Sequence, residues 1–86
     1  MDRRKSNQFF YEQNEKVIEI VKNSILRNEA FIEEIKEKMD TDPFLNDYDR
    51  EELEKKLKIV QDMVKHDKES LEELKKYSLL LQIEEN

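Results

Sequence analysis

Residues 53–81, LEKKLKIVQDMVKHDKESLEELKKYSLLL, hold the pattern that decides the fold. Residues of one register recur along this stretch at alternating spacings of three and four. They are Leu53, Leu57, Val60, Val64, Asp67, Leu71, Leu74, Ser78 and Leu81, with Met63 and Tyr77 beside them on one flank. Such spacing aligns side chains along one face of an α-helix. The stretch therefore predicts one long amphipathic helix.

The start of this helix is marked by a capping pattern. Asp49 is followed three residues later by Glu52. The Asp49 carboxylate can accept a hydrogen bond from a free backbone N–H of the first turn, and the Glu52 side chain can reach back to the N–H of Asp49. We therefore predict a helix over residues 50–83.

A second register of the same kind lies upstream. Its members are Tyr11, Ile18, Ile25, Ile32 and Met39 at steps of seven, with Asn14, Val21, Asn28 and Ile35 interleaved. Phe10, Val17 and Phe31 each precede a member of the first series and widen the apolar face beyond a two-position seam. We predict a helix over residues 7–39 whose apolar face is wide enough for a bundle.

Residues 40–49 separate the two predicted helices and form an acidic loop. The loop contains Pro43, the only proline of a chain that has no glycine. Asp42 before Pro43 can cap a short helical turn, because proline suits the first position of a helix. Phe44 and Leu45 would then cover the end of the bundle. A connection this short makes the two helices antiparallel neighbours.

The fold class that follows is all-α, an antiparallel helical hairpin of two long helices in a single domain of residues 1–86. Residues 1–6, which include Arg3, Arg4 and Lys5, are expected to form a flexible basic tail. A core built from 86 residues is marginally stable unless a second chain contributes surface. We therefore expect the hairpin to assemble into a homodimer, as a four-helix bundle.

One other organisation is compatible with the pattern. Ser70 and Glu73 form a second possible capping box, and residues 65–69 are wholly polar. A bend near residues 65–70 would give a three-helix bundle and would remove Asp67 from an otherwise apolar stripe. The unbroken register and the absence of glycine or proline at this point favour the long helix.

Composition excludes several classes of protein. The chain has no cysteine, which rules out disulfides and thiolate metal sites, and 44% of its residues are charged. No apolar run approaches the roughly 20 residues that a membrane span needs. We therefore expect a cytoplasmic protein that does not bind membranes.

Charge is divided unevenly along the predicted hairpin. Residues 33–54, at the turn end, contain ten acidic and three basic residues, a net charge of −7 in a chain whose total is −6. The carboxylates predicted to form an acidic binding pole are Glu33, Glu34, Glu37, Asp47, Asp49, Glu51, Glu52 and Glu54. A pole that only keeps the protein in solution is the competing interpretation.

The open end, where both termini meet, gathers surplus apolar residues. The residues predicted to contact a partner or a second copy are Phe9, Phe10, Tyr11, Val17, Ile18, Tyr77, Leu79, Leu80, Leu81 and Ile83. Consecutive helical residues lie about 100° apart, so a run such as 79–81 cannot face a single neighbouring helix. An exposed apolar patch usually marks an interface. The alternative is a C-terminal turn that folds back over these side chains.

Three polar residues interrupt the apolar stripes: Asn14, Asn28 and Asp67. A polar residue in a helical seam can determine register or oligomeric state at some cost in stability. Asn14 and Asn28 lie two heptads apart, so we consider both pairing across a symmetric interface and local access to solvent.

The sequence gives little support to catalysis or to a cofactor. Counted from Asp40, a calcium-loop pattern places Asp42 and Glu51 at ligand positions, but Leu45 stands where glycine is required. His66 is the only histidine, so no cysteine or second histidine can join it in a zinc site. A phosphotransfer role would need a four-helix bundle and a small residue beside the histidine, which one copy of this chain lacks. We predict that the protein is not an enzyme and has no metal, no cofactor and no direct contact with nucleic acid.

The function favoured by these patterns is a small acidic protein–protein interaction module, which self-associates and binds or regulates another protein. An alternative is an acidic inhibitor that imitates nucleic acid and blocks a nucleic-acid-processing protein, possible in a phage or mobile element. A second alternative is a purely structural coiled-coil element. The identity of the partner is not encoded in any of these patterns.

Overall fold

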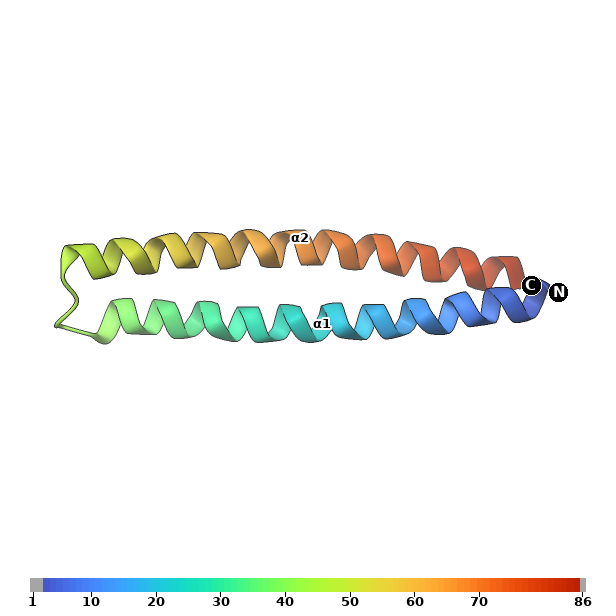
Figure 1. Ribbon diagram of the computed structural model, residues 1–86, viewed down its shortest axis with the longest axis horizontal. Helices are drawn as coiled ribbons and strands as arrows, with labels where there is room; N and C mark the ends of the chain where they lie inside the picture. The colour runs from blue at the N-terminus through green and yellow to red at the C-terminus, as the bar shows by residue number, and fades with distance from the viewer. Residues whose placement is uncertain (1–2, 86) are drawn as a thin grey trace.

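The computed structural model describes the backbone of residues 3–85 and the side chains of residues 7–83. Two helices of 39 residues each, α1 (Arg3–Thr41) and α2 (Asp47–Glu85), are joined by the loop 42–46. They run antiparallel along their whole length, so the start of α1 and the end of α2 lie at the same end of the molecule (Figure 1). The predicted all-α hairpin of two long helices is confirmed.

The helix boundaries extend beyond the predicted ones. α1 begins at Arg3 and ends at Thr41, where the sequence pattern indicated residues 7–39, and α2 covers Asp47–Glu85 where it indicated 50–83. Residues 3–6, expected in a flexible tail, are helical, and the first two residues of that tail lie outside the described residues. Propagation explains the difference, because each residue added to an existing helix gains a backbone hydrogen bond, and neither glycine nor proline occurs among the added residues.

α2 continues without a break through residues 65–70, which excludes the three-helix alternative. Asp67 stays in the seam between the helices, where its Oδ2 accepts a hydrogen bond of 3.3 Å from the Ser24 hydroxyl of α1. Residues 65–69 therefore belong to a continuous helix. All but Asp67 are exposed to solvent, and Asp67 has a hydrogen-bond partner in the seam.

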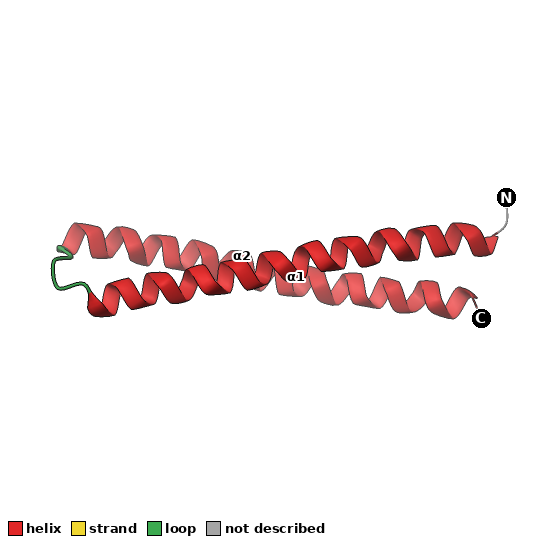
Figure 2. Cartoon of the chain, turned by 90° about the horizontal axis from the view of Figure 1, so that it is seen from below, coloured by secondary structure: helices red, strands yellow, loops and turns green. Residues whose placement is uncertain are grey.

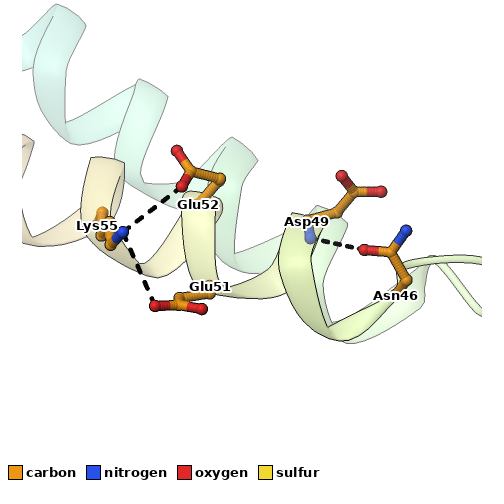
Figure 3. Close-up of polar contacts among 5 residues, drawn as sticks. All are labelled: Asn46, Asp49, Glu51, Glu52 and Lys55. Carbon is orange, nitrogen blue, oxygen red and sulfur yellow. Dashed lines mark hydrogen bonds and ion pairs between the residues drawn. The ribbon is translucent and has the colours of Figure 1, made fainter.

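The N-terminus of α2 is capped by Asn46 and not by Asp49. The side-chain Oδ1 of Asn46 accepts a hydrogen bond of 2.7 Å from the backbone N–H of Asp49 (Figure 3). Asn46 and Asp49 are three residues apart, which is the N-cap to N3 spacing, so the helix starts one turn earlier than predicted. Glu52 instead lies 3.5 Å from Lys55, which also reaches Glu51 at 3.7 Å (Figure 3).

The loop is shaped by Asp42. Its Oδ1 accepts a hydrogen bond of 2.9 Å from the backbone N–H of Phe44, which closes a tight turn around Pro43. The expectation that Phe44 covers the end of the bundle is wrong, because its side chain is 90% exposed. Leu45 is partly buried.

Arg50 ties the first turn of α2 to the last turn of α1. Its Nη2 donates a hydrogen bond of 3.2 Å to the backbone carbonyl of Met39. The usual helical donor to that carbonyl would be the N–H of residue 43, which proline lacks. Arg50 therefore satisfies a carbonyl at the C-terminus of α1, where a positive charge is also favourable.

The core is a single seam between two helices. Its buried apolar residues are Ile18, Ile25, Ile32, Ile35, Val60, Val64 and Leu81. The molecule measures 64 × 17 × 14 Å and its radius of gyration is 19.3 Å, where a compact domain of this length would have about 12 Å. Seen from below, the two helices cross at a shallow angle near their midpoints (Figure 2). At every level along the molecule, therefore, the two helices are held together only by the side chains of the seam between them.

Candidate interaction surfaces

A buried polar cluster holds the two helices in register near the open end. Asn14 Nδ2 donates hydrogen bonds of 2.8 Å to the carbonyl of Leu74 and 2.7 Å to the hydroxyl of Ser78. The Ser78 hydroxyl in turn donates to Glu15 Oε1 at 3.0 Å. Asn14 and Ser78 are 7% and 6% exposed. Asn14 is therefore paired within its own chain, where the sequence also allowed pairing across a symmetric interface.

One long flank of the hairpin is charged. In heptad terms the seam consists of positions a and d, and the flanking positions are e and g. Lys68 Nζ lies 3.6 Å from Glu29 Oε1, and both residues occupy e positions. The same two residues line a shallow hollow with Lys36 and Gln61, also e positions. In an antiparallel pair of helices, the e positions of both helices lie on one side of the seam and the g positions of both helices lie on the other.

The opposite flank is apolar, and we call it the apolar flank. Its g positions carry Phe10, Val17, Phe31, Met63 and Tyr77, each between 43% and 49% exposed. Three of the neighbouring c positions add Ile20, Ile59 and Leu80, which are also exposed, and the other described c positions are polar. Nearly half of the surface of each of these five g side chains is exposed within the described part of the chain. The hairpin therefore leaves apolar surface uncovered along this flank.

The apolar flank is ordered in layers. The contacts of Asn14 with Ser78 and of Ser24 with Asp67 set the register of the two helices. The g residues that this register places at the same level are Val17 with Tyr77, Ser24 with Ser70, Phe31 with Met63, and Lys38 with Lys56. The last two line one hollow at the turn end, which agrees with this placement. Two apolar layers thus lie on either side of a layer of serines.

The ten apolar residues predicted at the open end fall into three groups. Ile18 and Leu81 are buried in the seam, 4% and 5% exposed, and Tyr11 is partly buried with its hydroxyl accepting from Gln82 at 3.0 Å. Four others belong to the apolar flank. The remaining three point outward at b or f positions and are exposed: Phe9, Leu79 and Ile83. Only the last two groups are open to another molecule.

The acidic pole is present as an exposed surface. Among its eight predicted carboxylates only Glu52 is partly buried, and the other seven are exposed. Lys55 neutralises part of it through its contacts with Glu51 and Glu52. The sequence did not indicate the roles of Arg50 and Asn46 at this end, because both depend on contacts across the loop or on the exact first turn of α2.

The other candidate sites show no arrangement of ligands. Within the described residues there is no group of three or more histidine, cysteine or acidic side chains that could hold a metal ion. His66 is exposed, and its Nδ1 lies 3.8 Å from Glu69 Oε2 on the next turn. Neither helix, over its described residues, is long and apolar enough to cross a membrane.

The geometry of the site is thus that of a narrow hairpin with one apolar flank, one charged flank and an acidic turn. Compared with known proteins, the chain matches no family model, no curated protein and no solved structure.

Proposed function

We propose that this protein is a small acidic protein–protein interaction module of the cytoplasm, which self-associates and binds or regulates another protein without catalysis or a cofactor. The observation that carries the proposal is apolar surface that the hairpin does not cover. This surface comprises the apolar flank and the three outward residues of the open end, Phe9, Leu79 and Ile83. Exposed apolar surface of this extent is typical of a binding site.

The total surface area supports the same conclusion. The chain exposes 6971 Å², whereas a compact monomer of 10.6 kDa would expose about 5,500 Å². The excess, about 1,500 Å² on one chain, is larger than the roughly 800 Å² that each partner buries in a standard protein–protein interface. A monomeric hairpin therefore leaves apolar side chains exposed, and association with a second molecule would bury them.

Affinity capture from the source cells, at low and at high salt, tests the proposal. The open-end variant replaces Phe9, Leu79 and Ile83 with glutamate. The matched control places three glutamates at exposed positions of α1, replacing Asn23, Leu26 and Ala30. We expect the wild type and the control to retain a partner at high salt and the open-end variant to lose it, because apolar recognition is not screened by salt. Equal capture by all three proteins would contradict the proposal.

The exposed carboxylates of the acidic pole favour a second candidate function, the nucleic-acid-mimicking inhibitor. Seven of them are exposed at the turn end, where their negative charges could enter a basic, nucleic-acid-binding groove of another protein. In the same capture experiment, a variant with Glu51→Lys, Glu52→Lys and Glu54→Lys would lose its partner, and the wild type would lose it at high salt. Failure to capture any partner under all conditions would favour the purely structural coiled-coil element.

A further inference from the structure

We propose that the apolar flank is covered by a second copy of this chain, packed face to face and antiparallel, so that the turn end of each hairpin lies beside the open end of the other. The two-fold axis passes through the layer of Ser24 and Ser70. This inference rests on the self-association part of the proposed function and specifies its surface and direction.

The centre of the apolar flank is suited to a symmetry axis. Ser24 and Ser70 are the smallest residues among the g positions of the flank, and they lie at the same level near the middle of the two helices. Small side chains let helix backbones approach closely. At a two-fold axis each serine faces its own copy, so α1 packs on α1 and α2 on α2 of the second chain.

The apolar layers match one another across this axis. Phe31 and Met63 lie seven residues to one side of the serines, and Val17 and Tyr77 lie seven residues to the other, about 10 Å in each direction. The antiparallel arrangement therefore places Phe31 over Val17 of the second copy and Met63 over its Tyr77. Further out, it pairs two apolar residues of α2.

That outer pair is Ile59 with Leu80 of the second copy, eleven and ten residues from Ser70 on opposite sides. A parallel arrangement would leave both without an apolar counterpart, because the c residues of α1 nearest these levels are Glu34 and Gln13. Both residues are more than half exposed in the isolated hairpin.

Charge favours the antiparallel direction. Residues 33–54 of each copy carry a net charge of −7, and a parallel dimer would hold two such segments side by side. It would also stack Lys38 on Lys56 of the second copy. The antiparallel dimer separates the two acidic ends and places Lys38 near Phe10 of the second copy, where an ammonium group over an aromatic ring is favourable.

The available face is large enough for a stable dimer. A face of 64 × 17 Å has an outline of about 1,000 Å², and a standard interface buries about 800 Å² on each partner. The charged flank does not offer an apolar face of this size. Its e positions carry charged or amide side chains throughout the described residues: Gln8, Glu15, Lys22, Glu29, Lys36, Asp47, Glu54, Gln61, Lys68, Lys75 and Gln82. The second copy thus has one face on which to dock.

Sedimentation equilibrium and a pulsed electron-spin distance measurement on the full chain test the proposal. The chain has no cysteine, so a single spin label can be attached through Phe44→Cys at the exposed tip of the loop. We expect a dimer at about 100 μM with a label-to-label distance of about 60 Å, because the tip lies about 20 residues from the axis on each copy. A parallel dimer would give a distance below about 30 Å and would overturn the antiparallel direction.

Matched variants test the surface. The double substitution Phe31→Glu with Met63→Glu places charge on the apolar flank at exposed positions, and we expect a monomer that keeps its helical circular-dichroism spectrum. The control, Leu26→Glu with Ala30→Glu, adds the same number of negative charges at exposed b and f positions of α1, outside both apolar surfaces, and we expect it to remain a dimer. A dimer that survives the first pair, or a wild-type monomer, overturns the second-copy proposal. Partner capture through the open end would still stand in that case, so the two proposals fail separately.

Discussion

Asn14 shows how one polar side chain can specify an alignment that apolar packing alone leaves open. Isoleucine, leucine and valine side chains in a seam can slide by a heptad with modest loss of contact. Asn14, by contrast, donates to the Leu74 carbonyl and the Ser78 hydroxyl, and the hydroxyl is available at one register only. A shift of α2 that puts Leu71 in the place of Ser78 would remove this second acceptor from a buried amide, and an unsatisfied buried donor costs on the order of 1–3 kcal/mol.

We expect Asn14→Ala to lower the free energy of unfolding by about 2 kcal/mol, because two buried hydrogen bonds and some packing are lost. The control is Asn23→Ala, the same change at an exposed position of the same helix, which should alter stability by less than about 0.5 kcal/mol. Urea denaturation followed by circular dichroism at equal protein concentration measures both. Equal effects would show that the amide contributes only through helix propensity.

Arg50 is a second residue whose role depends on one contact. We expect Arg50→Gln to cost about 1 kcal/mol, since it leaves the Met39 carbonyl without its donor and removes a positive charge from the C-terminus of α1. Arg27→Gln, at an exposed position in the middle of α1, is the control. Thermal unfolding compares the two. A larger loss from Arg27→Gln would refute the capping role.

At the scale of the helices, the sequence pattern predicted type and direction well and boundaries less well. Heptad spacing identifies a helix over many turns, so the register of Ile18, Ile25 and Ile32 was sufficient to predict α1. The first residue of a helix, by contrast, depends on the orientation of one capping side chain. Both Asn46 and Asp49 are good cap residues, and only the geometry of the loop decides that Asn46 takes the position.

The cap assignment gives a test at this scale. We expect Asn46→Ala to destabilise the hairpin by about 1 kcal/mol and Asp49→Ala to do so by less, because Asn46 supplies the accepting oxygen. Amide hydrogen exchange at residue 49 should accelerate in the first variant. If Asp49→Ala proves the more damaging of the two, the helix begins where the sequence pattern placed it.

The candidate surfaces were partly predictable for a related reason. Position in the heptad distinguishes seam from flank, which is why Phe10, Val17 and Phe31 could be identified as widening the apolar face. The open-end cluster could not be divided from the sequence, since the burial of Leu81 and the exposure of Leu79 depend on which side of α2 meets α1. Phe44 was misplaced because the Asp42 turn, a local hydrogen bond, directs it outward.

At the scale of the whole molecule, the proposed dimer would make stability depend on association, because the isolated hairpin has a single seam. If the apolar flank is buried against a second chain, dissociation and unfolding are coupled, and the melting temperature rises with protein concentration. We expect an increase of roughly 5 °C for each tenfold increase in concentration for the wild type. The Phe31→Glu, Met63→Glu variant should melt at one temperature throughout. Differential scanning calorimetry over two decades of concentration measures both, and a wild-type melting temperature independent of concentration would argue against coupled association.

α1 begins and α2 ends at the same end of a hairpin that is 64 Å long, so the loop lies at the opposite end of the molecule from the start of α1 and the end of α2. A fluorescent protein fused to either terminus would lie far from the acidic turn of its own chain. In the antiparallel dimer, two such fusions would be held at opposite tips, too far apart for efficient energy transfer between them, and each would lie beside the acidic turn of the other copy. Tags at the termini therefore leave the acidic turn free in a monomeric variant such as Phe31→Glu with Met63→Glu, and a surface that presents the loop is best built from that variant anchored at its termini.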